Sequence, residues 1–188
     1  MKYIKFSITI ALLSVVGILI YYNVTNKTRE EKQNQQQNDN HVVAEVINKD
    51  LEKDYPVSAR QVLKYYNEIQ KCYYNYECTD EEIEALAKKA YQLLDPDLLK
   101  VNPFDKFLEN LKKDIAEYRL VGRKISNTLL DKSNEVEYYP DYNATINCTY
   151  YLKDKNNNTS KVIQTFVLRK DDNKQWKIYG FKIYEPED

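Results

Sequence analysis

The chain has 188 residues and a formal net charge of −1, a length that suits one domain with appendages. Its 3 glycines and 1 histidine argue against glycine loops that cradle phosphate, histidine-based zinc sites and Ser-His or Cys-His catalysis. The near-zero charge argues against an electrostatic nucleic-acid binder. The composition therefore predicts no cofactor, no metal and no nucleic-acid partner.

The N-terminal segment has the length and composition of a membrane anchor. Residues 6–26 carry no charged side chain, and about 20 apolar helical residues span the hydrocarbon core of a bilayer. Lys5 precedes the apolar run, and Tyr21 and Tyr22 follow it at a position that suits the interface. We predict a short cytoplasmic tail at 1–5 and a single-pass transmembrane helix at 6–24, with the rest of the chain extracytoplasmic.

Two alternatives to this uncleaved anchor remain open. A cleaved signal peptide is less favoured, because the apolar run is longer than a usual signal core and lacks small residues at its end. A buried helix of a soluble protein is the third interpretation. The expected location is the cell membrane, with the N-terminal helix as the contact to it.

A polar linker is expected over residues 25–54. Residues 25–41 are low in complexity and too polar to offset the entropy of ordering. Residues 42–53 contain apolar side chains at roughly helical spacing, which could form a short helix within the linker. The globular domain is predicted to occupy residues 55–188.

Three helices are predicted at the start of this domain. Ser58 and Thr79 are each followed three residues later by Gln or Glu, the pattern of a capping box. Asn102 precedes a proline and is expected to cap the third helix. Pro96 is expected to end the second helix, and Gly122 to follow the third in a left-handed conformation.

Beyond Gly122 the apolar period changes from helical to alternating, which indicates half-buried antiparallel strands. The predicted strands, the first two weaker than the others, are 125–130, 136–139, 144–152, 162–169 and 175–184, with a turn at 171–173. Helices that precede an antiparallel sheet are typical of the α+β class. We predict three helices followed by a curved antiparallel sheet of four to five strands.

The C-terminal hairpin carries a resemblance to a known fold. Residues 166–181 read as a strand, a polar turn and a second strand that contains Trp176, Gly180 and Phe181. This hairpin resembles the last hairpin of nuclear transport factor 2-like (cystatin-like) domains. The resemblance implies a cone-shaped fold with a pocket between sheet and helices, which relatives use as enzymes or as binding modules.

A second resemblance covers roughly residues 54–184. It rests on four motifs and the hairpin; the motifs are Tyr55-Pro56-x-Ser58-x-Arg60, Lys71-Cys72-x-Tyr74, Thr79-Asp80-Glu81-Glu82 and Glu137-Tyr138-Tyr139. Together they resemble an uncharacterised family of membrane-anchored proteins of clostridial-type Gram-positive bacteria. That family has no assigned active residues, so the resemblance implies no catalytic residue here.

The candidate ligand-binding residues are aromatic. Tyr66, Tyr73, Tyr118 and Tyr150 lie on predicted inward faces, and Trp176 belongs to the apolar face of the last strand. Aromatic side chains with polar edges suit a small-ligand or peptide pocket. The alternative interpretation is that they fill the core.

Cys72 and Cys78 are candidates for a disulfide between the first two helices, since such bonds form outside the membrane. The alternative is two small buried apolar residues. Cys148 lies on the apolar face of a strand and is expected in the core. The absence of a CxxC motif gives no support for metal or thioredoxin-like chemistry.

The sequence shows no clear acidic residue on the apolar faces of the predicted helices or of the three best strands, which argues against catalysis. We therefore expect a membrane-anchored, extracytoplasmic, non-catalytic module that binds a small ligand or another protein. The alternatives are an accessory subunit that docks on another envelope protein and, less favoured, an enzyme that uses the pocket.

Overall fold

The computed structural model describes residues 34–132, 137–139 and 143–184. The predicted tail and transmembrane helix lie outside these residues. Within the described ranges, no helix combines the length and the apolar character needed to cross a bilayer. The chain is helical over residues 34–48, and a compact unit begins at Val42. Three residues of the predicted linker are buried in this unit: Val43, Val46 and Leu51.

Two helices begin where their caps predict. Helix α2 (Ala59–Asn75) is capped by Ser58, whose Oγ accepts from the Gln61 N–H at 3.2 Å. Helix α3 (Asp80–Gln92) has a complete capping box: Thr79 Oγ1 accepts from the Glu82 N–H, and Glu82 Oε2 accepts from the Thr79 N–H. These starts are confirmed because a cap depends only on residues within one turn of each other.

The next part of the chain differs from the prediction, since Pro96 begins a short additional helix. Helix α4 (Pro96–Val101) is capped by Asp95, whose Oδ1 accepts from the Asp97 N–H at 2.9 Å. Asn102 ends α4 and donates to the Leu98 carbonyl at 3.1 Å, so the prediction that it caps the third helix is wrong. Proline suits the first turn of a helix because its missing N–H has no partner there.

Helix α5 (Phe104–Leu120) follows, and Gly122 lies just beyond it. Its φ of 62° confirms the predicted left-handed conformation. A Cβ at this position would also lie 3.0 Å from the Lys155 Cβ. Both observations explain why glycine ends this segment.

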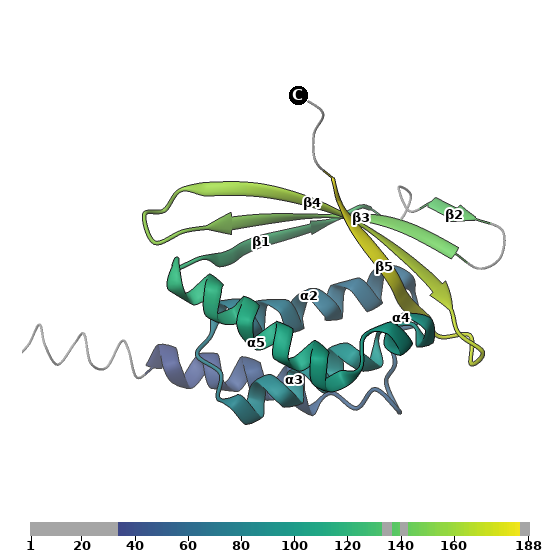
Figure 1. Ribbon diagram of the computed structural model, residues 1–188, viewed down its shortest axis with the longest axis horizontal. Helices are drawn as coiled ribbons and strands as arrows, with labels where there is room; N and C mark the ends of the chain where they lie inside the picture. The colour runs from purple at the N-terminus through teal and green to yellow at the C-terminus, as the bar shows by residue number, and fades with distance from the viewer. Residues whose placement is uncertain (1–33, 133–136, 140–142, 185–188) are drawn as a thin grey trace, which may run out of the picture. The chain divides into compact units, whose positions relative to one another are not determined.

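The five strands are antiparallel: β1 (Lys124–Leu130), β2 (Glu137–Tyr139), β3 (Asn143–Lys153), β4 (Thr159–Lys170) and β5 (Trp176–Tyr184). The sheet has the order β1-β3-β4-β5, and β2 also pairs with β3. The predicted α+β class, with helices followed by an antiparallel sheet, is confirmed. Helices α2, α3 and α5 all lie on one side of the sheet (Figure 1). We call the sheet surface toward them its inner face.

A bulge in β5 changes which side chains reach this inner face. Leu168 pairs with Ile178 and Val167 pairs with Gly180, so Tyr179 is an extra residue. Ile178 is buried on the inner face, and strict alternation would direct Phe181 outward. Because of the bulge, Phe181 instead pairs with the buried Phe166 and shares its face.

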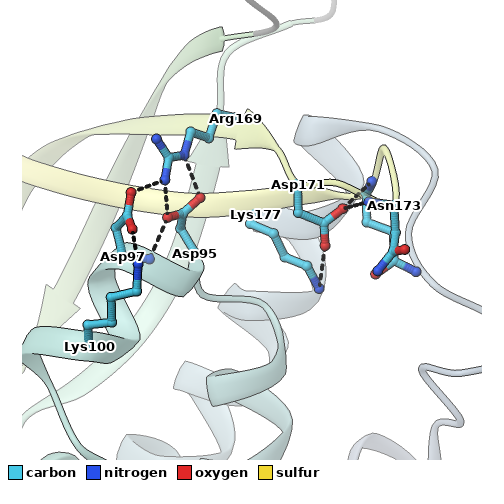
Figure 2. Close-up of polar contacts among 8 residues, drawn as sticks. Asp95, Asp97, Lys100, Arg169, Asp171, Asn173 and Lys177 are labelled. Carbon is cyan, nitrogen blue, oxygen red and sulfur yellow. Dashed lines mark hydrogen bonds and ion pairs between the residues drawn. The ribbon is translucent and has the colours of Figure 1, made fainter.

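An ion pair fastens α4 to the sheet (Figure 2). Asp95 is 1% exposed, and its two carboxylate oxygens accept from Nε and an Nη of Arg169 on β4, each at 2.6 Å. The same guanidinium contacts Asp97 and lies 4.5 Å from the ring centre of Tyr179. In addition, the Asp95 N–H donates to the Ile178 carbonyl at 2.9 Å. Together these contacts fix the chain between α3 and α5 on the edge of the sheet.

Candidate functional site

A pocket of about 450 Å³ lies between α2, α5 and the inner face of the sheet. Pockets that bind small molecules typically have volumes of about 300–1,000 Å³. Its lining residues come from six elements: Tyr66, Gln70, Tyr74, Phe107, Asn110, Leu111, Asp114, Tyr118, Ile125, Tyr150, Leu152, Val162, Gln164 and Phe181. We call this cavity the sheet–helix pocket.

Helix α2 supplies Tyr66, Gln70 and Tyr74 to one wall. Their spacing of four places them in one row along the helix surface. The Tyr66 ring contacts Phe166 edge-on, with 6.0 Å between ring centres, and Phe166 in turn contacts Phe181 at 5.4 Å. The wall is therefore continuous with the aromatic part of the core.

Helix α5 supplies Asp114 and Tyr118, which lie four residues apart on one face. The rings of Tyr118 and Tyr74 are 4.3 Å apart between centres and tilted by 34°. The Tyr74 hydroxyl donates a hydrogen bond to Asp114 Oδ2. These contacts hold two aromatic rings and one carboxylate together at the junction of the two helices.

The sheet wall contains Tyr150 from β3 and Val162 and Gln164 from β4. The Tyr150 hydroxyl donates to Oδ1 of the buried Asn67 at 2.7 Å, and Asn67 Nδ2 contacts Cys148 Sγ at 3.3 Å. Tyr150 therefore contributes to the pocket while its hydroxyl is held by a buried amide. This interaction fixes the orientation of one pocket wall.

The tyrosines of the pocket are neutral at physiological pH. Burial raises the pKa of Tyr66 to about 12 and also raises the pKa values of Tyr118 and Tyr150. The pKa of Tyr74 is raised by burial and by its hydrogen bond to Asp114. Apart from these tyrosines, Asp114 is the only lining residue with an acidic or basic side chain.

The structure brings together three of the five predicted pocket residues. Tyr66, Tyr118 and Tyr150 line the sheet–helix pocket, whereas Tyr73 and Trp176 do not. Tyr73 is buried in the core, because it lies about 100° around the helix from Tyr74. Trp176 is buried near the start of β5, where its carbonyl accepts from the Tyr55 hydroxyl.

The expectation that no clear acidic residue lies on the apolar faces of the predicted helices is wrong at Asp114, and Asp95, which lies outside those predicted elements, is also buried. Asp114 lines the pocket, and its spacing from Leu111 and Tyr118 on the apolar face of α5 was a usable signal. Asp95 is buried, and its burial could not be read from the sequence because it depends on Arg169, which is 74 residues away. The sequence also did not predict that Phe181 lines the pocket, since no local sequence pattern indicates the bulge in β5.

The three cysteines are free and buried, and Cys78 Sγ donates to the Cys72 carbonyl at 3.4 Å. The sequence left open either a Cys72–Cys78 disulfide or two small buried residues, and in the structure both are buried free thiols. Burial raises the pKa of Cys72 to about 12 and that of Cys78 to about 11, so both thiols are protonated at neutral pH.

We expect an aromatic disulfide reagent to titrate none of the thiols in the folded chain and all 3 after unfolding in guanidinium. The thiolate is the nucleophile, and both burial and a raised pKa suppress it in the folded state. A titration of only one thiol after unfolding would show instead that Cys72 and Cys78 are bridged.

In the part of the chain that the structure describes, no three His, Cys, Asp or Glu residues are grouped so that they could hold a metal ion.

Helices followed by an antiparallel sheet, with an aromatic pocket between them, define an α+β domain with a ligand-sized cavity. The chain belongs to the family described as Domain of unknown function (DUF6715), whose model matches residues 1–181.

No curated protein matches the chain. Among solved structures, one that is similar to it is a crystal structure described as a calcium/calmodulin dependent protein kinase II association domain from Xanthomonas campestris. That protein is 16% identical, with a TM-score of 0.38. The match covers 69% of this chain and 86% of that one.

Proposed function

We propose that this protein is a membrane-anchored, extracytoplasmic, non-catalytic binding module whose sheet–helix pocket takes a small ligand with an apolar body. The observation that carries the proposal is the pocket of about 450 Å³ with aromatic walls. A core filled by its own side chains would have favoured the docking subunit instead. We further assign the domain to the nuclear transport factor 2-like architecture, which the element order and the position of the pocket support.

The walls of the pocket are held in place before any ligand binds. Tyr150 is held by Asn67 and Tyr74 by Asp114, while Phe181, which is 53% exposed, contacts the ring of Phe166. A preformed site loses less side-chain freedom on binding than a site that must be ordered, so more of the contact energy remains as affinity.

A pair of adjacent positions on β4 gives a matched test. Val162 lines the pocket, while Ile163 belongs to the opposite face of the same strand. We expect that some soluble aromatic fragments will bind the pocket and raise the unfolding temperature of the full chain, measured in nonionic detergent. Val162→Phe should abolish this stabilisation by filling the pocket, and Ile163→Phe should preserve it. Fragments that stabilise neither the parent chain nor the control would contradict the proposal, as would fragments that stabilise Val162→Phe equally.

An enzyme is the second candidate, and the Tyr74–Asp114 hydrogen bond is the observation that favours it. A carboxylate beside a phenol in a partly water-excluded pocket has the groups that general acid–base catalysis needs. Turnover of a bound fragment that is lost in Asp114→Asn would replace the binding module with this candidate.

The proposed location has its own test. External protease should digest the C-terminal domain on intact spheroplasts if the predicted anchor has its N-terminus in the cytoplasm. Protection of that domain until the membrane is dissolved would overturn the extracytoplasmic assignment.

A further inference from the structure

We propose that the ligand of the sheet–helix pocket carries a positively charged ammonium group, held by the Asp114 carboxylate within the surrounding tyrosine rings. This inference rests on the proposed binding function and names the chemical class of the ligand. It requires a carboxylate with free hydrogen-bonding capacity, aromatic rings beside it, and no competing cation in the pocket.

The carboxylate has capacity to spare. An ionised carboxylate can accept about four hydrogen bonds. Among the described residues, Asp114 accepts one side-chain hydrogen bond, from the Tyr74 hydroxyl to Oδ2, and no side chain donates to Oδ1. The other polar lining residues are the amides Gln70, Asn110 and Gln164, none of which carries charge. The ligand is thus left to supply the charge that complements Asp114.

A ligand that covers Asp114 removes water from its carboxylate, and the cost of this step depends on the charge of the ligand. Burying an unpaired charge is costly. An anionic ligand adds repulsion, and a neutral ligand leaves the charge unpaired. An ammonium group, substituted or not, compensates the lost hydration directly, because it brings the opposite charge into contact with the carboxylate.

The neighbouring rings favour the same class. Tyr74 and Tyr118 pack against each other with 4.3 Å between ring centres, and the other aromatic lining residues are Tyr66, Phe107, Tyr150 and Phe181. Aromatic faces attract cations, and boxes of several rings are a common way to bind substituted ammonium groups. Tyr74 and Tyr118 cover one face of each other, and the Arg123 guanidinium lies 5.3 Å from the ring centre of Tyr118, so the other rings of the lining are the ones open to a ligand cation.

Arg123 does not occupy the proposed site. It is exposed and is not among the residues that line the pocket, so water and salt screen its repulsion toward a bound cation. The lining contains no lysine or arginine. The net charge of the pocket wall is therefore set by Asp114.

Two probes of the same shape separate charge from apolar fit. Choline has a charged quaternary nitrogen where 3,3-dimethylbutan-1-ol has a neutral quaternary carbon, and the two molecules are otherwise alike in shape. We would measure their dissociation constants for the full chain in nonionic detergent by equilibrium dialysis of radiolabelled probe, with a detergent blank. Choline is expected to bind about tenfold more tightly than its neutral isostere, from the cation–π and carboxylate contacts together.

Two variants locate that preference. Asp114→Asn should abolish most of the choline preference while the affinity for the neutral alcohol is unchanged, and Glu117→Gln, an exposed position on the same helix, should preserve it. Tyr66→Leu, at another aromatic residue of the lining, should lower the preference by about threefold, which keeps the proposal testable if Asp114→Asn does not fold.

The outcomes distinguish the two proposals. Equal affinity for both probes in the parent chain would overturn the cationic ligand and leave the binding module standing. A choline preference that survives Asp114→Asn, or an equal loss of both probes in that variant, would also overturn it, since Asp114 would then act only on the structure. If neither probe binds, the cationic ligand fails, and the binding module is decided separately by the stabilisation of the full chain with aromatic fragments.

Discussion

Replacing Arg169 with methionine is expected to lower the free energy of unfolding by about 3 kcal/mol. The guanidinium holds both oxygens of Asp95, which is 1% exposed, whereas the Arg169 side chain is 35% exposed. Methionine replaces the bulk of the arginine stem but leaves a buried carboxylate without its ion partner. The destabilisation comes from this uncompensated charge more than from the net value of the ion pair.

Equilibrium urea unfolding of the full chain in nonionic detergent measures this change. Lys100→Met is the matched control: Lys100 contacts Asp97 in the same cluster, but its side chain is 74% exposed, so the loss should stay below about 0.5 kcal/mol. Adding Asp95→Asn to Arg169→Met should recover part of the loss, because asparagine removes the buried charge and still caps α4. Equal effects of Arg169→Met and Lys100→Met would contradict the assigned role of the ion pair.

The parts of the fold that the sequence predicts are those whose causes are local. Ser58 and Thr79 mark helix starts because a capping side chain bonds an amide only three residues away. Alternation along β3 predicts a half-buried strand because neighbouring side chains point to opposite faces. The sequence did not predict helix α4, because a segment as short as Pro96–Val101 shows no apolar period. In addition, a proline can end one helix or begin another.

The candidate site divides in the same way. Tyr66, Tyr118 and Tyr150 follow from periodicity, and Asp114 could have followed from its spacing on α5. Phe181 could not, because its orientation depends on a bulge that pairing with β4 imposes on β5. Asp95 lies just before Pro96 and Arg169 at the end of a predicted strand, and neither position by itself indicates a buried ion pair. Only their proximity in the folded chain makes them a buried pair.

Replacing Asn67 with leucine is expected to lower the free energy of unfolding by about 2 kcal/mol. Asn67 is 3% exposed, and its Oδ1 accepts the Tyr150 hydroxyl at 2.7 Å. Leucine has similar volume and cannot accept a hydrogen bond, so the buried Tyr150 hydroxyl is left with only the weak interaction with the Cys148 thiol. The cost is the lost hydration of that hydroxyl rather than a cavity.

A double-mutant cycle tests this assignment by urea unfolding. Tyr150→Phe removes the hydroxyl that Asn67→Leu would strand, so the double variant should be more stable than the sum of the two single losses predicts. Strictly additive losses would show that Asn67 acts through packing alone. Tyr150→Phe also keeps the aromatic ring in the pocket wall. Its affinity for choline should therefore match the parent chain, since the hydroxyl is engaged by Asn67 and is not available to a ligand.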